Sequence, residues 1–315
     1  MNTTIIISKF WTRIWAFLID TLILGVIGYL FGLMIQDFLI GIGSYGLILG
    51  LIITVSYQTI CNSKLLDGQT IGKHFMEIQV VDINGNTIGV GKSFLRALIL
   101  SFPYFTYNLS IPGLADTSFI SVVKTIGLLS IIIGVVVIYI FNKQTRQSLH
   151  DLIIGTYVAK TEERDEPIAI PGVTKTPFYV FGGFLVLLIG IGIYSVNSNG
   201  VQNLSGIYTK VSKIDGVISA NVNERTIFFN GTKTLVYETT LSVKALPNDD
   251  LENDKIVRET ARTILNDVSN INSFNAITIS LNRGFNIGIA SHNTAKTVSY
   301  SPGEWREILQ QTTQN

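Results

Sequence analysis

The sequence predicts a mainly α-helical polytopic membrane protein: a bundle of about five transmembrane helices, one of them short, followed by a C-terminal extracytoplasmic α+β domain. Hydrophobic residues make up 47% of the 315 residues and charged residues only 14%, whereas about a quarter of an average soluble domain is charged. The mean hydropathy, +0.41, points the same way. All long apolar runs lie before residue 197, and charged residues, Asn, Ser and Thr become frequent after it.

Four apolar runs are long enough to cross a bilayer, which takes about 20 residues. A fifth run, 94–109, is shorter and holds Arg96 and Pro103, so it is either a short or kinked crossing or a segment in the interface. The first run contains Asp20 and lacks a small-residue cleavage site, which indicates a signal anchor rather than a cleaved signal peptide. The four long runs are 14–35, 39–61, 119–141 and 177–196.

Lysine and arginine gather in three polar segments, namely the N-terminus, 63–96 and 142–176, whereas 36–44 and 109–118 contain neither. Because short loops rich in basic residues stay in the cytoplasm, all three segments are expected on the cytoplasmic side. This arrangement requires 94–109 to cross. We therefore expect five crossings of a bacterial-type plasma (inner) membrane, with the N-terminus cytoplasmic and the C-terminal domain extracytoplasmic.

These segments divide the chain into four parts. A transmembrane domain, 1–160, is followed by a cytoplasmic linker, 161–176, which has mixed charges and proline. A further transmembrane helix, 177–196, leads into the extracytoplasmic α+β domain, 197–315.

Period-two alternation in the C-terminal domain predicts strands at 217–229 and 234–245, joined by a turn at Asn230-Gly231. A second hairpin is expected to pair 276–281 with 285–290 around 282–284. Apolar residues at helical spacing predict a helix at 256–268, and a short helix is expected to begin near Pro302. The capping candidates for the first of these helices are Asn248, Asp249 and Asp250.

The composition excludes several classes of function. A net charge of +1 gives no reason to expect a nucleic-acid partner. The single cysteine, Cys61, cannot form an internal disulfide, and His74, His150 and His292 lack a second ligand at metal spacing. Gly91-Lys92-Ser93 lacks the earlier glycine of a phosphate-binding loop. We therefore expect no metal, no cofactor and no enzymatic activity.

The informative residues are ionisable groups in or beside the membrane. Asp20 lies seven residues after Arg13 on one face of the first helix, a separation of about 10 Å. A carboxylate at the centre of a membrane helix costs about 2.5–3.5 kcal/mol, so Asp20 should face the bundle interior and have a partner. It is either half of a structural charge pair, a proton or ion site, or a protonated acid that is merely hydrogen-bonded.

Two further charges belong to this intramembrane charge network. Arg96 begins the short run, and Asp151 lies where the chain returns to the inner surface. Considered alone, Arg96 is an interface anchor that extends its guanidinium to water, and Asp151 is an N-cap of the segment after it. Which carboxylate pairs with Arg13 is open: spacing on one helix favours Asp20, but Asp151 can approach at the inner surface.

Three ordered motifs give the chain its resemblance to a known family. The first is FWTRIWAFLID, from Phe10 to Asp20; the second is GQTIGK, at 68–73, which precedes Arg96; and the third is QSLHDLIIGTYV, at 147–158. Together they resemble the RDD family of membrane proteins, named for one arginine and two aspartates. The resemblance covers about residues 8–160. It implies that Arg13, Asp20 and Asp151 carry the family's three charges, for which a transport role has been proposed.

Two functions of different classes are open. In one, the bundle is a transport component for an ion or small solute, Asp20 titrates, and Arg13 and Asp151 control its access. Because five helices make a small bundle, this role calls for a homo-oligomer or a membrane-protein partner. In the other, the protein is an accessory or sensor protein anchored in the lipid bilayer, and its outer domain binds an envelope partner. A polar cavity that reaches Asp20 favours transport, and a dry, fully paired Asp20 favours the anchor.

Overall fold

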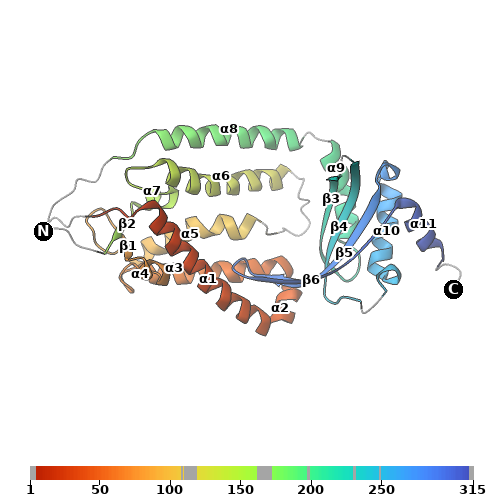
Figure 1. Ribbon diagram of the computed structural model, residues 1–315, viewed down its shortest axis with the longest axis horizontal. Helices are drawn as coiled ribbons and strands as arrows, with labels where there is room; N and C mark the ends of the chain where they lie inside the picture. Colours follow the sequence, from red (N-terminus) through yellow and green to blue (C-terminus); the bar gives the residue numbers. More distant parts are fainter. Residues whose placement is uncertain are drawn as a thin grey trace.

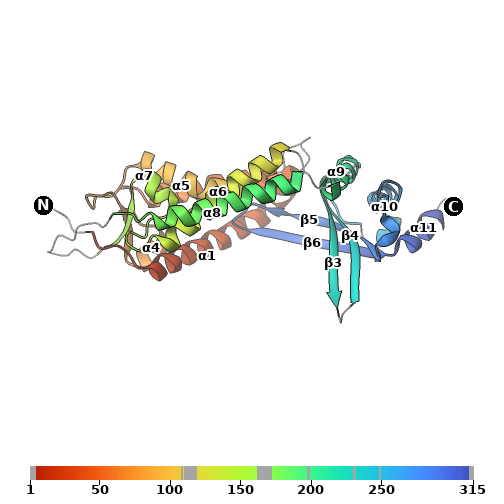
Figure 2. The same cartoon turned by 90° about the horizontal axis from the view of Figure 1, so that it is seen from above.

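The computed structural model describes residues 5–107, 109, 119–161, 172–196, 199–229, 232–247 and 250–311. The molecule is elongated, with a helical bundle at one end and an α/β domain at the other (Figure 1). The long helices of the bundle run along its length side by side, as the view from above also shows (Figure 2). The C-terminal domain is therefore placed beyond one end of the bundle.

Four helices of the described residues are long and apolar enough to cross a membrane, and they correspond to the four long apolar runs. They span Phe10–Met34, Gln36–Cys61, Ile120–Phe141 and Thr176–Tyr194. The elements of the bundle are α1 (Phe10–Met34), α2 (Gln36–Ile42), η1 (Gly43–Tyr45), α3 (Gly46–Cys61), α5 (Val90–Tyr107), α6 (Phe119–Phe141) and α8 (Thr176–Val196).

The short apolar run folds as α5, which contains Pro103 and packs between α3 and α6. Arg96 is buried in this helix, together with Ser93 and Ser101. Because neighbouring helices cover these polar groups, α5 does not need the uniformly apolar surface of the other four. The expectation that Arg96 is an interface anchor reaching water is therefore wrong. A fifth crossing by α5 stays a prediction.

A small polar layer closes the end of the bundle that lies away from the C-terminal domain (Figure 1). Its centre is an antiparallel pair of strands, β1 (Ile78–Val81) and β2 (Tyr157–Lys160). A turn at Asn84-Gly85 follows β1, with Gly85 at φ 82°, but β1 forms its ladder with β2, and the isolated bridge Val81–Thr87 crosses the turn. Two short helices complete the layer, α4 (Ile71–Phe75) and α7 (Leu149–Ile154).

The C-terminal domain is a four-stranded sheet with helices over one face (Figure 2). The strand order is β3-β4-β5-β6, and only β4 and β5 are parallel. Its core contains the fully buried side chains of Tyr237, Leu241, Ile264, Ile279 and Trp305. The elements are α9 (Asn199–Val211), β3 (Val217–Phe229), β4 (Thr232–Val243), η2 (Leu251–Asn253), α10 (Lys255–Asp267), η3 (Ile271–Ser273), β5 (Ala276–Asn286), β6 (Ser291–Tyr300) and α11 (Pro302–Gln311).

Several sequence expectations for this domain need correction. The second hairpin does not turn at 282–284, because β5 continues to Asn286 and pairs with β6. The N-cap of α10 is Asp254, whose carboxylate accepts from the N–H groups of Ile256 and Val257; Asp250 instead precedes η2. Helix α9 was not expected. The turn at 230–231 and the capping candidates 248–249 lie outside the described residues.

The tip of the β5–β6 hairpin, residues 284–290, inserts into the bundle. Phe285 and Ile287 are buried there, packed with Leu39 of α2. Glycines admit them: a Cβ on Gly32 of α1 would lie 2.3 Å from the Phe285 ring, and one on Gly50 of α3 would lie 1.6 Å from the Ile287 carbonyl oxygen. Irregular backbone at membrane depth is tolerated only where protein or a cavity surrounds it. The sequence 285–290 resembles a strand because its alternate residues Phe285 and Ile287 are apolar, and these are the side chains that the bundle buries.

Polar contacts also hold the hairpin. The Arg283 guanidinium lies 2.8 Å from the carboxylate of Asp37. The Tyr104 hydroxyl donates to the Gly288 carbonyl over 3.2 Å. The C-terminal domain and the bundle are thus joined by a docked hairpin in addition to the chain connection at α8.

Enlarging Gly50 should undock this hairpin. We expect Gly50→Ala to lower the free energy of unfolding in detergent by about 1–3 kcal/mol, because the backbone of Ile287 cannot move aside as a side chain would. Thermal unfolding measures the loss. The matched control is Gly127→Ala in α6, where a new Cβ meets no atom within 4 Å. If Gly50→Ala and Gly127→Ala had the same melting temperature, the hairpin would not be docked against Gly50.

The topology is testable with single cysteines in a Cys61→Ser background. Asn84 and Lys143 are exposed in the polar layer, and Lys233 is exposed in the C-terminal domain. We expect membrane-impermeant maleimide to label Lys233→Cys in intact cells, and to label Asn84→Cys and Lys143→Cys only after permeabilisation. Labelling of Lys143→Cys in intact cells while Asn84→Cys stays protected would show that α5 does not cross.

Candidate functional site

Asp151 is the centre of a buried cluster of charged side chains. Its Oδ2 lies 2.6 Å from Nη2 of Arg13, and its Oδ1 lies 2.9 Å from Nη2 of Arg96. The arginines belong to α1 and α5 and the carboxylate to α7, so one acid joins three helices. The Asp151 side chain is 0% exposed. A buried charge of this kind is tolerated because it is both paired and hydrogen-bonded.

The start of α7 positions the Asp151 carboxylate. The backbone N–H of Ser148 donates to Oδ2 over 3.3 Å, and the Thr156 hydroxyl donates to Oδ1 over 3.1 Å. Ser148 is the N-cap, and Asp151 is the third helical residue of a capping box. The interpretation of Asp151 as the N-cap is therefore wrong. The helix ends at Ile154 and is followed by its C-cap, Gly155, which adopts a left-handed φ of 71°.

Arg13 reaches Asp151 and leaves Asp20 without an arginine partner, contrary to the pairing that same-helix spacing favours. The Arg13 guanidinium also donates to the Arg146 carbonyl and lies 4.9 Å from the centre of the Tyr139 ring. These partners lie around the start of α1. Asp20 is two turns further along the helix, beyond the reach of the same guanidinium.

Asp20 is 4% exposed and is held by neutral donors. Its Oδ1 accepts from the Tyr57 hydroxyl at 2.7 Å and from the Gly72 N–H at 2.8 Å, and its Oδ2 accepts from the Thr70 hydroxyl at 2.6 Å. The last two donors belong to the start of α4. Within the described ranges, no cation lies within ion-pair distance of Asp20.

The start of α4 approaches α1 closely enough to require glycine. A Cβ on Gly72 would lie 2.1 Å from the Ala16 carbonyl oxygen. Thr70 is the N-cap of α4, and its hydroxyl accepts from the Lys73 N–H while donating to Asp20. The carboxylate therefore completes the cap of a short helix that folds against the membrane helices.

A lysine and a histidine stand beside these acids. The Lys73 ammonium donates to the side chain of Asn62, which is 1% exposed, and Lys73 itself is half-buried. Burial of this ammonium, reinforced by Arg96, lowers the pKa of Lys73 to about 7. Burial also lowers the pKa of His150 to about 3, which leaves its imidazole neutral at pH 7. Burial alone would raise the pKa of Asp151, but Arg96, His150 and Arg13 outweigh it and hold that pKa well below its usual range.

Two cavities meet at Asp20. Both are lined by Asp20, Gln58 and Leu100. The first, of about 360 Å³, is mostly apolar and extends to Gly288 and Ile289 at the hairpin tip. The second, of about 320 Å³, extends toward the polar layer and is lined by the basic side chains of Arg13, Lys73 and Arg96 and by the neutral imidazole of His150. Asp20 thus lies where two cavities with mainly apolar walls meet, and the basic side chains of Arg13, Lys73 and Arg96 border the second.

The structure joins three of the four sequence-predicted charges directly, namely Arg13, Arg96 and Asp151, and brings Asp20 to the same cavity. Sequence reasoning missed Lys73 as a buried amine. It also missed the three donors to Asp20. The signal was available in the GQTIGK motif, which contains Thr70, Gly72 and Lys73.

The comparisons with known proteins agree with the motifs. Residues 7–155 match the model of the RDD family, which confirms the resemblance over the helices and polar layer that contain the site. The region after residue 155 has no family match. Searches of curated proteins and of solved structures found no match.

The ion-pair cluster predicts a non-additive mutant cycle. Asp151→Asn should destabilise the protein by about 3–5 kcal/mol, because it leaves two buried guanidiniums with no carboxylate between them. Arg13→Gln should cost less, since Arg96 still neutralises the acid. Combining the two should recover part of the loss, measured by thermal unfolding in detergent.

A surface pair provides the control for this cycle. Lys210 and Asp267 lie 2.7 Å apart with side chains 59% and 30% exposed, and exposed pairs contribute about 0–1 kcal/mol. Lys210→Gln and Asp267→Asn should therefore have small, additive effects. Additive behaviour of the Arg13 and Asp151 variants would contradict a shared buried network.

Proposed function

We propose that the RDD region of this chain, residues 7–155, is a proton-coupled transport component in which Asp20 and Lys73 bind and release the proton. The observation that carries the proposal is the position of Asp20 between the two cavities. Ionisable residues inside membrane segments often belong to ion or proton paths, and the donors to Asp20 among the described residues are neutral. The proposal keeps the polar layer cytoplasmic and the C-terminal domain extracytoplasmic.

Asp20 and Lys73 are the two groups of the second cavity that are proposed to exchange the proton. The three donors to Asp20 are neutral, so they orient the carboxylate without cancelling its charge. Lys73 lines the same cavity, and its lowered pKa lets the amine exchange a proton near neutral pH. The carboxylate and the amine together supply an acceptor and a donor at the inner end of the path.

The two arginines that bind Asp151 have a different role in this mechanism. Arg13 and Arg96 are both bound to Asp151, so they are fixed in place and stay charged. Their charge discourages other cations from entering at the inner end, and a proton carried by Lys73 does not need to cross as a free cation. This arrangement favours a proton over a metal cation.

The second candidate, an accessory or sensor protein, is supported by one specific observation. The hairpin of the C-terminal domain reaches the cavity at Asp20 through Gly288 and Ile289. In this version, a conformational change in the C-terminal domain is passed to the bundle through the contact of the hairpin. In this version the charge cluster is purely structural.

Proton flux into proteoliposomes distinguishes the two. With a pH gradient and an enclosed pH dye, we expect Asp20→Asn to lose at least about tenfold in flux, because an amide cannot carry a proton. Lys73→Met should remove the part of the pH dependence centred near pH 7, since the pKa of Lys73 is about 7. A panel of cation gradients tests the choice of ion.

The matched control is Asp67→Asn, an exposed acid whose φ of 51° suits asparagine. Each variant is first shown to keep the melting temperature and oligomeric state of a folded protein. If folded Asp20→Asn conducts like the wild type across all gradients, transport is wrong and the sensor interpretation holds.

A further inference from the structure

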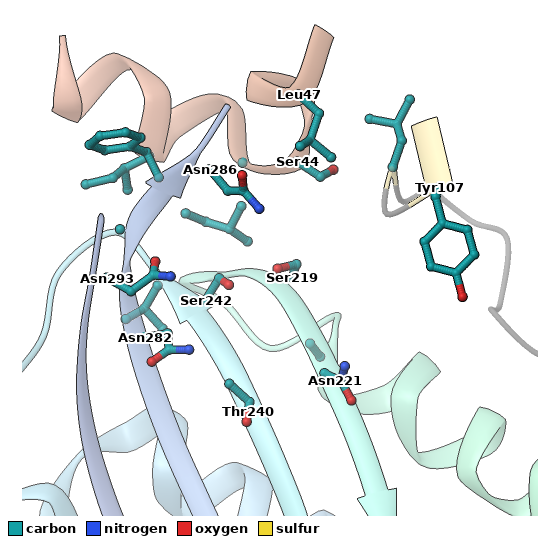
Figure 3. A pocket seen from close by; sticks show the side chains of 18 of the residues that line it. Ser44, Leu47, Tyr107, Ser219, Asn221, Thr240, Ser242, Asn282, Asn286 and Asn293 are labelled. Atoms are coloured by element: carbon teal, nitrogen blue, oxygen red, sulfur yellow. The ribbon is translucent and has the colours of Figure 1, made fainter. Parts of the chain in front are cut away.

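A separate pocket of about 510 Å³ lies between the sheet of the C-terminal domain and the bundle (Figure 3). The sheet contributes one wall from β3, β4, β5 and β6, and the bundle contributes Ser44, Leu47 and Tyr107. The pocket shares none of its described lining residues with the two cavities at Asp20. Its volume falls within the range of about 300–1,000 Å³ that small-molecule sites occupy.

The polar wall follows from strand alternation. Successive side chains on a strand point to opposite faces, so Leu241 enters the core while Thr240 and Ser242 face the pocket. Ser242 is paired across the sheet with Ser219 on one side and with Asn282 on the other. Hydroxyl and amide groups therefore form a row across three strands, as Figure 3 shows.

These polar side chains have free hydrogen-bonding capacity. Six of them make no side-chain hydrogen bond to any described part of the chain, although each is able to donate and accept. The charged residue of the described lining is Lys124, and its ammonium already donates to the Leu109 carbonyl over 3.0 Å. The six are Ser44, Ser219, Thr240, Ser242, Asn282 and Asn293.

The chemistry of the wall selects among ligand classes. A cation would find no carboxylate in the described lining, and an anion would compete with Leu109 for Lys124. An apolar ligand would leave the free polar groups unpaired, which costs about 1–3 kcal/mol for each group that becomes buried. A peptide strand pairs with a sheet edge, but this pocket lies on the face.

We propose that this pocket binds a neutral, hydroxyl-rich ligand, namely a short saccharide. Sugar hydroxyls donate and accept like the serine, threonine and asparagine groups of the wall, and the half-buried ring of Tyr107 gives an apolar surface for a sugar face. The ligand bridges the C-terminal domain and the bundle. The inference concerns binding alone and does not depend on the proposed transport.

The test is isothermal titration calorimetry on the full chain in nanodiscs. The probes are the neutral disaccharides cellobiose and diacetylchitobiose and the trisaccharide maltotriose. We expect at least one to bind at millimolar concentration or better. Asn282→Ala and Asn293→Ala should each weaken that binding about tenfold, the equivalent of one well-made hydrogen bond. The deacetylated, cationic chitobiose should bind at least about tenfold more weakly than the neutral form.

Ser299→Ala is the matched control. Ser299 is exposed and lies on the same face of β6 as Asn293, but it does not line the pocket. It should change affinity less than twofold, and all variants should keep the wild-type melting temperature without ligand. Absence of binding by all three saccharides overturns the proposal. So does saccharide binding that both asparagine variants leave unchanged, or preferential binding of a tetra-alanine peptide.

Discussion

One carboxylate ties the membrane part of the molecule together. Asp151 accepts the guanidiniums of Arg13 and Arg96 and the N–H of its own helix cap, so α1, α5 and α7 meet at a single buried charge. Removing water from such a group is expensive unless it is paired and hydrogen-bonded. This requirement fixes the start of α1 and of α5 at the same depth. It also anchors the polar layer, because the strand after α7, β2, forms the ladder with β1.

The same requirement, that polar groups be satisfied away from water, explains the other end of the bundle. The hairpin tip brings main-chain carbonyls against α1, α3 and α5, and it is accepted where Gly32 and Gly50 leave room for it and where Tyr104 donates to it. At Asp20 the problem is solved with a short helix, whose N-terminal N–H and capping threonine turn toward the acid. Each solution uses a neighbour that is distant in sequence.

Contacts between residues distant in the sequence are the part of the structure that the sequence patterns could not predict. Apolar runs, alternating strands and unusual charges are local patterns, and they located the four long helices, the β3–β4 pair and the charged residues. Helical spacing places Arg13 and Asp20 on one face, but it contains no information on how the chain after α6 brings Asp151 of α7 to Arg13. Likewise, the alternation at 285–290 is the same for a free strand as for a tip buried in a bundle. The turn was misplaced because the residues that surround Phe285, Gly32 of α1 and Leu39 of α2, are distant in the sequence.

The hairpin connects the two functional interpretations. Asn286 and Asn293 line the polar pocket at the base of the tip, and Gly288 and Ile289 line the apolar cavity that reaches Asp20. The proposed saccharide would therefore contact the same hairpin whose tip borders the cavity at Asp20. A site that favours one position of the hairpin must, by linkage, bind more tightly when the hairpin occupies that position. Both proposals therefore depend on the β5–β6 hairpin, which lines the polar pocket with its strands and the apolar cavity at Asp20 with its tip.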